Sequence, residues 1–155
     1  MDKSLLVVGG TGVISFAVVN EALKQGFKVT CINRGKSRNQ ILPKEVETII
    51  ANYKDKELIS KKLENRHFNA VLDVLCFHKE DIDYSLSILK DHCDQYLFFS
   101  SAEVYNKPKY KNEVYDETAE LSNPLWDYSI NKALCEIELI RLAKKIGRAS
   151  CRERV

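Results

Sequence analysis

The sequence of 155 residues predicts one α/β domain built as a doubly wound parallel sheet. Three observations lead to this fold class. Short apolar runs recur along the chain without polar alternation, which is typical of parallel strands covered on both faces. Amphipathic segments with helical spacing lie between these runs. A glycine-rich turn directly follows the first run, and strand–helix alternation of this kind builds a sheet with helices on both sides.

The expected elements alternate along the chain. The strands are expected at residues 4–8, 28–32, 46–51, 69–76 and 95–100. The helices are expected at residues 13–25, 54–64 and 81–92, and a longer one begins near Trp126. A basic, polar stretch at 33–44 and a long segment at 101–124 are expected to be loops. The sheet is thus expected to break off after the fifth strand and the helix that follows it.

The last ten residues, 146–155, break the apolar periodicity of the preceding helix. One set of codons for these residues spells a widely used short-read sequencing adapter in frame. We therefore expect residues 146–155 to be non-native read-through and the native domain to span residues 1–145. The alternative is a basic helix C-terminus, where the helix dipole favours arginine.

Composition and charge exclude several classes of protein. The formal net charge is +2, and the chain without residues 146–155 has as many basic as acidic residues. This balance gives no reason to expect a nucleic acid or an anionic membrane as partner. The apolar run at 5–8 is too short for a signal peptide or a membrane span. The cysteines and histidines lack the spacing of metal ligands, so we expect no metal site. The cysteines are expected to be buried free thiols, and the protein is expected to be cytoplasmic.

The glycine-rich turn at residues 9–15 has the form of a phosphate-binding loop. Its first glycine allows a tight turn, its second lets backbone approach a pyrophosphate, and the helix N-terminus supplies N–H groups. Ser15 stands at the third glycine position and is small enough for close helix–strand packing. A glycine turn alone is a weak indication, but its place between strand and helix strengthens it. The predicted dinucleotide contacts here are Gly9, Thr11, Gly12, Val13 and Ile14.

The end of the second expected strand is basic where a carboxylate would bind the ribose hydroxyls of NAD. The guanidinium of Arg34 suits the 2′-phosphate of NADP and can also stack on adenine. The alternative is a solvated basic loop. We therefore predict NADP as the preferred cofactor, with NAD as the other choice. The predicted contacts of this region and of the following strand ends are Asn33, Arg34, Asn52, Leu75 and Cys76.

Tyr128 and Lys132 lie four residues apart and hence on one face of the expected helix. An ammonium near a phenol stabilises phenolate, which lowers the tyrosine pKa and makes it a usable acid–base group. Ser101 follows the fifth expected strand at the end where open α/β sheets bind ligands. This spacing alone is common by chance, so the order of glycine turn, basic turn, serine, tyrosine and lysine carries the prediction.

This arrangement resembles the extended short-chain dehydrogenase/reductases, the NAD(P)-dependent epimerase/dehydratase family with its Rossmann-type fold. The resemblance spans residues 5–145 and implies catalytic roles for Ser101, Tyr128 and Lys132, the last two also touching the cofactor. It implies an NAD(P)-dependent oxidoreductase or epimerase acting on a hydroxyl or carbonyl carbon of a nucleotide sugar or related small molecule. The alternatives are an NADP-dependent carbonyl reductase of the same superfamily and a non-catalytic or RNA-binding relative.

The resemblance has further implications. It makes residues 1–145 an incomplete NAD(P)-binding domain, inactive without a C-terminal substrate domain, and by analogy it allows a homodimer. No nucleic acid or membrane partner is expected. Glu103 is left outside the catalytic set, because Ala102 stands where the family's dehydratases carry a second acid. Asp73 stands where many relatives carry a histidine, and we interpret it as a strand-end acid held by hydrogen bonds.

Overall fold

The computed structural model describes residues 3–36, 40–107, 109, 114–116, 118–121, 123–146 and 151–153. Six parallel strands form one sheet in the order β3-β2-β1-β4-β5-β6. The strands are β1 (Ser4–Val8), β2 (Lys28–Asn33), β3 (Glu47–Ile50), β4 (Phe68–Asp73), β5 (Cys93–Phe99) and β6 (Cys151–Glu153). The helices are α1 (Val13–Lys24), α2 (Lys56–Leu63), α3 (Lys79–Leu89), α4 (Asp127–Ile146) and the 3-10 helix η1 (Ala102–Val104).

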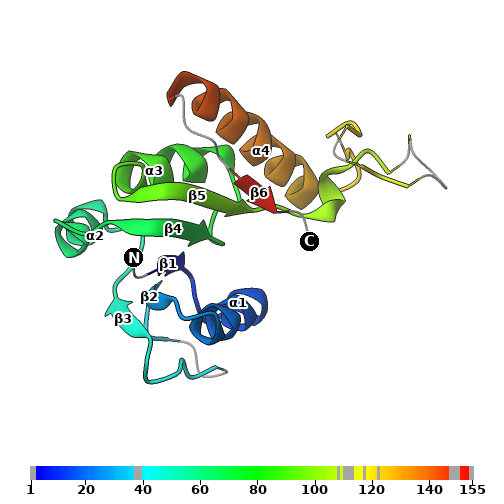
Figure 1. Cartoon of the computed structure of the whole chain (residues 1–155). Coiled ribbons are helices and arrows are strands. Elements are labelled where there is room, and N and C mark those ends of the chain that lie inside the picture. Colours follow the sequence, from blue (N-terminus) through cyan, green and yellow to red (C-terminus); the bar gives the residue numbers. More distant parts are fainter. Residues whose placement is uncertain are drawn as a thin grey trace.

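Helices cover both faces of the sheet (Figure 1). Helix α1 lies on one face, and α3 and α4 lie on the other. The chain builds outward from β1 to β3 and then returns to place β4 on the other side of β1. This reversal between β1 and β4 is the point where doubly wound sheets bind ligands, at the C-terminal ends of the strands. The predicted fold class is confirmed.

The apolar runs form strands because both sides of each central strand are buried. In β1, Leu6 and Val8 pack into the cluster shared with α2, α3 and α4. Leu5 and Val7 point the other way, into the cluster with Val19 of α1. Successive side chains of a strand face opposite sides, so a strand buried on both faces needs an unbroken apolar run.

The segment between β4 and α3 differs from its prediction. Strand β4 ends at Asp73, whereas the prediction extended it to residue 76. The Asp73 carboxylate accepts a hydrogen bond from the backbone N–H of Leu75 (2.9 Å), which turns the chain out of the sheet. Helix α3 begins at Lys79 because Asp81 accepts from the backbone N–H groups of Phe77 and His78, both at 2.9 Å. Two carboxylates therefore shape the β4–α3 turn.

Strand β6 makes the sheet one strand wider than predicted. Leu97, Phe98 and Phe99 of β5 pair in parallel with residues 151–153. The outer edge of β5 offers unpaired backbone groups, and an extended chain of almost any sequence can pair with such an edge. The read-through origin of residues 146–155 stays a prediction, and residues 147–150, 154 and 155 lie outside the described part of the chain.

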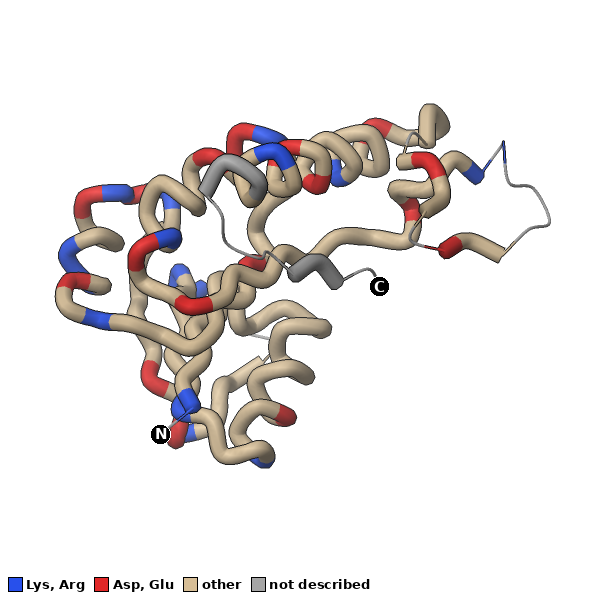
Figure 2. The backbone as a smooth tube through the Cα atoms, turned by 45° about the horizontal axis from the view of Figure 1, so that its top comes forward, with Lys and Arg blue, Asp and Glu red and all other residues tan. Residues whose placement is uncertain are grey.

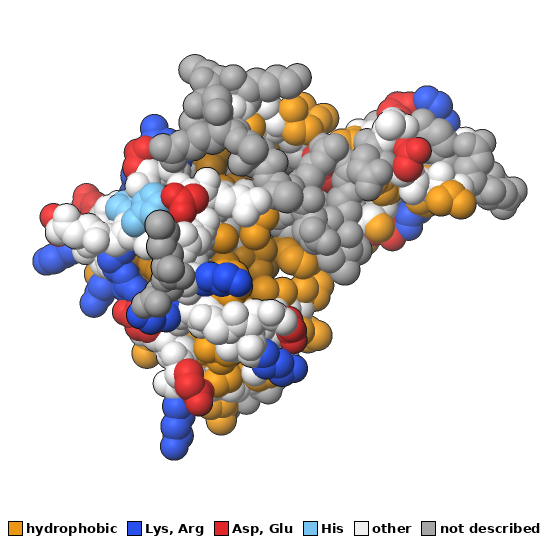
Figure 3. Space-filling view, viewed as in Figure 1, with side chains coloured by type: hydrophobic (Ala, Val, Ile, Leu, Met, Phe, Trp, Pro, Cys, Tyr) orange, Lys and Arg blue, Asp and Glu red, His pale blue; other side chains and the backbone are white. Residues whose placement is uncertain are grey.

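Charged and apolar side chains are distributed differently over the surface. Basic and acidic residues are interspersed along the described backbone (Figure 2). Apolar side chains are visible between α1 and the neighbouring strands (Figure 3). On this face Ala70, Val74, Leu97 and Phe99 are only partly buried. The described helices thus cover the α1 face less completely than the opposite one.

Candidate active site and cofactor site

The glycine turn after β1 is packed tightly from two sides. Gly9 has a positive φ of 90°, and a Cβ there would meet Cδ2 of Leu75 and Cγ2 of Val74 at 2.9 Å. A Cβ on Gly10 would lie 2.6 Å from Sγ of Cys31. Only glycine fits between β2 and the β4–α3 turn, and the bare backbone that results is the kind a pyrophosphate can approach.

Ser15 ties this turn together from within. Its buried hydroxyl donates to the carbonyl of Gly9 (2.7 Å) and accepts from the backbone N–H of Gly12 (3.1 Å). Close packing against the strand was predicted for Ser15, but these hydrogen bonds were not. Ser15 thus engages the N–H of Gly12 itself, and the dinucleotide contacts predicted at Gly12, Val13 and Ile14 stay predictions.

Replacing Ser15 by alanine is expected to lower the free energy of unfolding by about 1 kcal/mol, because the carbonyl of Gly9 and the N–H of Gly12 lose their hydrogen bonds to the buried hydroxyl. Urea denaturation measures this loss. Ser87→Ala is the matched control, because its hydroxyl is exposed and also donates to a backbone carbonyl. Equal losses in the two variants would contradict the structural role of Ser15.

The adenosine end of the site contains a buried amide without a partner. Asn33 is only 8% exposed, and its Nδ2 makes no hydrogen bond to the described residues. It lies 3.7 Å from where a Cβ of Gly10 would be, directly beside the glycine turn. A buried donor of this kind costs free energy until it finds an acceptor. A ligand with hydroxyl or phosphate oxygens fits this position, as a dinucleotide would.

Three further residues lie near the adenosine end of the site. Arg34 is exposed, as a residue that meets a phosphate from solvent needs to be. Gln40, with its amide nitrogen turned toward the glycine turn, donates to the carbonyls of Thr11 (3.2 Å) and Gly12 (3.1 Å). Nothing in the sequence pattern pointed to Gln40, because its partners are backbone atoms. Asn52 lies exposed beyond the end of β3. Arg38, in the same basic stretch, lies outside the described residues.

Lys132 is the most deeply buried of the predicted catalytic residues, with 3% of its surface exposed. Its ammonium donates to the carbonyl of Cys76 (3.0 Å) and to that of Phe99. It also lies over the ring of Phe98, 4.2 Å from the centroid. Burial lowers the pKa of Lys132. The lysine therefore links α4 to the C-terminal ends of β4 and β5.

Tyr128 and Ser101 lie nearer the surface. The half-buried Tyr128 is in the first turn of α4, with its ring centroid 4.9 Å from that of Trp126. Ser101 precedes η1, and its Oγ accepts from the backbone N–H of Glu103 (3.2 Å). The hydrogen bonds of the described residues do not join Tyr128 to Ser101 or Lys132. The fold thus brings the three to one edge of the sheet, while their predicted roles stay predictions.

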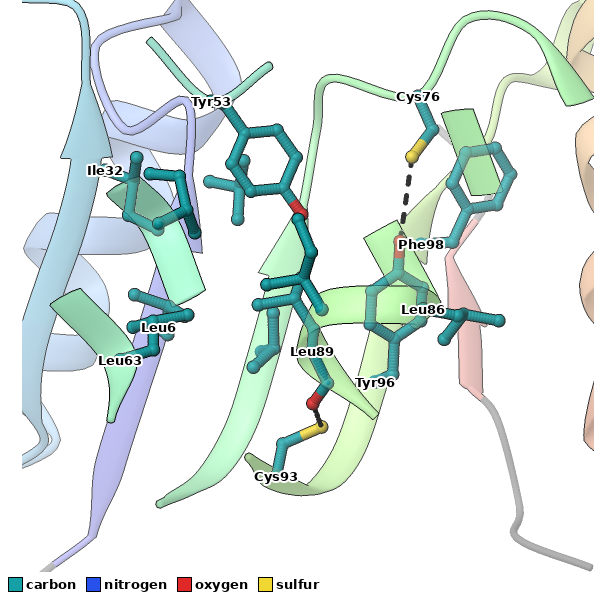
Figure 4. Close-up of a cluster of buried hydrophobic side chains, with 14 of the residues drawn as sticks. Leu6, Ile32, Tyr53, Leu63, Cys76, Leu86, Leu89, Cys93, Tyr96 and Phe98 are labelled. Atoms are coloured by element: carbon teal, nitrogen blue, oxygen red, sulfur yellow. Dashed lines mark hydrogen bonds between the residues drawn. The ribbon is translucent and has the colours of Figure 1, made fainter. Parts of the chain in front are cut away.

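Two further predicted contacts come from the β4–α3 turn. Leu75 is partly exposed beside Gly9, in a position to line a ligand. Cys76 is buried, and burial raises the pKa of its thiol. Its side chain points into the core, toward Tyr96 (Figure 4). Its carbonyl, which accepts from Lys132, is its link to the site. The partly exposed Phe77 was not predicted.

The described residues carry few signs of other sites. None of their helices has the length and apolarity to cross a membrane. Within the same residues, no group of three or more His, Cys, Asp or Glu side chains could hold a metal ion.

Free, buried thiols were predicted and are confirmed for the four cysteines whose side chains are described, Cys31, Cys76, Cys93 and Cys135.

The chain is similar to proteins of one known family. Residues 5–151 match the model of the NAD dependent epimerase/dehydratase family. The chloroplast stem-loop binding protein of 41 kDa b from Arabidopsis thaliana is 30% identical over 118 residues. That alignment covers 68% of this chain and 31% of the relative.

Several solved structures share the fold. The UDP-Glc/GlcNAc 4-epimerase of Campylobacter jejuni superposes with a TM-score of 0.82 at 16% identity, covering 98% of this chain and 53% of that one. The UDP-glucose 4-epimerase of Bifidobacterium longum, in complex with NAD+ and UDP, gives 0.81 at 20% identity, covering 98% and 52%. Vestitone reductase from alfalfa gives 0.74 at 16% identity, covering 96% and 55%. The chain thus spans about half the length of these structures.

Proposed function

Because this chain belongs to the NAD-dependent epimerase/dehydratase family, we propose that it binds a nicotinamide dinucleotide across the β1–β4 switch point. We further propose hydride transfer at a hydroxyl- or carbonyl-bearing carbon of a small molecule. The observation that carries the proposal is the glycine turn. It is closed to side chains by Cys31, Val74 and Leu75, and it lies beside the unpartnered amide of Asn33.

The proposed chemistry divides among three side chains. A bound nicotinamide supplies the hydride donor or acceptor. Tyr128 would give a proton to the substrate oxygen or take one from it at its phenolic oxygen. Ser101 would orient that oxygen through its hydroxyl. Lys132 would place a positive charge near the phenol and favour phenolate, and its burial strengthens such an effect.

We propose NADP as the preferred cofactor on the basis of Arg34. Arg34→Ala is expected to weaken NADPH binding by about 10-fold or more, since a hydrogen bond to a charged group contributes about 1.5–3 kcal/mol. NADH lacks the 2′-phosphate, so its dissociation constant is expected to rise much less, by no more than the loss of stacking on adenine. Fluorescence titration of both cofactors measures the two constants.

Arg141→Ala is the matched control for Arg34→Ala. Its guanidinium is exposed and pairs with Glu138 on α4. This variant is expected to bind both cofactors as the wild type does. Tighter binding of NADH than NADPH by the wild type would refute the preference. Failure to bind either one would refute the proposed function as a whole.

We propose that this chain is the cofactor-binding part of a longer protein whose further domain selects the substrate. Its structural neighbours include nucleotide-sugar epimerases and one reductase. The two activities differ in cofactor balance: an epimerase returns the hydride to the same molecule, whereas a reductase consumes NADPH. Incubating the complete protein with UDP-glucose, or with a carbonyl substrate and NADPH, while following absorbance at the nicotinamide band separates them.

A second candidate function is RNA binding. The observation in its favour is the similarity to a protein named for stem-loop binding. The interspersed charges of the described chain do not favour it, since RNA binding by charge needs a basic surface. Fluorescence anisotropy with a labelled stem-loop RNA tests it. Binding that survives saturating NADPH would support a separate RNA site, and no binding at low salt would dismiss it.

A further inference from the structure

The carboxylate of Asp73 is completely buried at the end of β4. Its Oδ2 accepts hydrogen bonds from the hydroxyls of Ser85 (2.6 Å) and Tyr96 (3.0 Å). The thiol of Cys76 donates to the same oxygen at 3.3 Å, and the backbone N–H of Leu75 donates to Oδ1. All four donors are neutral. The network thus surrounds a fully buried carboxylate with hydrogen-bond donors and brings no positive charge to it.

Cys76 connects the carboxylate of Asp73 to the ammonium of Lys132. Its thiol donates to Asp73, and its carbonyl accepts from Lys132 at 3.0 Å. Among the described residues no ion pair joins Asp73 and Lys132 directly. The carboxylate and the ammonium are therefore buried on either side of one residue. At low dielectric such charges interact strongly even without contact.

The electrostatic surroundings of Lys132 leave few groups to balance its charge. Burial lowers its pKa, and the groups that oppose this effect are Cys135, Cys76, Asp73 and Glu136. Burial raises the pKa of both thiols, Cys135 to about 12, so they are neutral near pH 7. The carboxylates of Asp73, from β4, and Glu136, from α4, remain. Glu136 accepts a hydrogen bond from Ser100 at 2.5 Å.

We propose that Asp73 is a positioning residue for Lys132. It shapes the turn that presents the carbonyl of Cys76, and its buried charge keeps the ammonium protonated away from water. The use of Lys132 at a cofactor rests on the proposed function, but the pairing of the two charges does not. Asp73 thus has a role beyond the strand-end hydrogen bonds expected from the sequence.

The direct test is an NMR titration of the lysine side-chain ammonium groups, with the Lys132 signal assigned by its loss in Lys132→Met. Asp73→Asn keeps the size of the side chain and removes its charge. We expect the titration midpoint of Lys132 to fall by roughly one pH unit in this variant. The control Asp94→Asn removes an exposed carboxylate that pairs with His67, and it should leave the midpoint unchanged. An unchanged midpoint in Asp73→Asn overturns the proposal.

A second test compares the melting temperatures of the wild type, Asp73→Asn, Lys132→Met and the double variant. Lys132→Met is expected to lower Tm in the wild type, because it leaves the Asp73 charge unbalanced. It should raise Tm in Asp73→Asn, because it then removes an unbalanced ammonium. A double variant no more stable than Asp73→Asn overturns the pairing, even if Asp73→Asn folds poorly. Neither test involves a cofactor, so both distinguish this inference from the proposed function.

Discussion

Replacing Tyr128 by phenylalanine is expected to lower the turnover of the complete protein by a factor of about 10² to 10⁴. The phenol is the group that we propose to exchange a proton with the substrate oxygen, and phenylalanine keeps the ring without the acid. The ring packs against Trp126 at the start of α4, so the fold should not change. The dissociation constant for NADPH is expected to stay within roughly twofold, since the loss lies in the chemical step.

The measurement for Tyr128 is a comparison of kcat with cofactor affinity. Tyr115→Phe is a matched control, because that ring stacks on Tyr105 at a centroid distance of 5.3 Å and keeps this stacking without its hydroxyl. It is expected to retain wild-type turnover. Normal turnover in Tyr128→Phe would remove Tyr128 from the reaction and leave the chain as a cofactor-binding domain alone.

Replacing Phe98 by alanine is expected to lower the free energy of unfolding by about 3–5 kcal/mol. Phe98 is completely buried on β5 and packs in the cluster that contains Cys76, Leu86 and Tyr96 (Figure 4). Removing its ring leaves a cavity in this cluster. The change also removes the aromatic face above which the Lys132 ammonium lies. Urea or thermal denaturation gives the value.

Phe77→Ala separates the two contributions at Phe98. The Lys132 ammonium also lies over the ring of Phe77, 5.6 Å from the centroid, but Phe77 is 45% exposed. We expect its replacement to cost less than about 1 kcal/mol, because little apolar surface leaves a buried environment. If both variants lost the same stability, the cation–π contact rather than burial would dominate at Phe98.

The fold class and the positions of β1 to β5 could be predicted because they follow from local patterns. The run at Ser4–Val8 requires burial on both faces, and the glycine turn after it marks the C-terminal edge of the sheet. The end of β4 could not be predicted. The apolar run continues to residue 76, but the Asp73 carboxylate competes for the backbone N–H of Leu75. A side chain that captures backbone in this way overrides a strand pattern.

The contacts inside the candidate site could not be predicted from the sequence, for a different reason. The predicted partner of Lys132 was the phenol four residues away, whereas its ammonium donates to carbonyls of Cys76 and Phe99. Every residue has a backbone carbonyl, so the residue type does not show which carbonyl will accept a hydrogen bond. The pairing of Ser100 with Glu136 likewise joins β5 to α4 across the fold. Such contacts depend on how elements pack, which periodicity does not specify.

The tight packing of the glycine turn also constrains how this sequence can change over generations. Position 10 faces the side chain at position 31, and position 9 faces those at 74 and 75. A methyl group gained at Gly10 needs the space that the sulfur of Cys31 now fills. A side chain at position 10 therefore requires a smaller residue at position 31 first, so two positions distant along the chain are coupled. At Gly9 smaller neighbours would not suffice, because its positive φ disfavours any side chain.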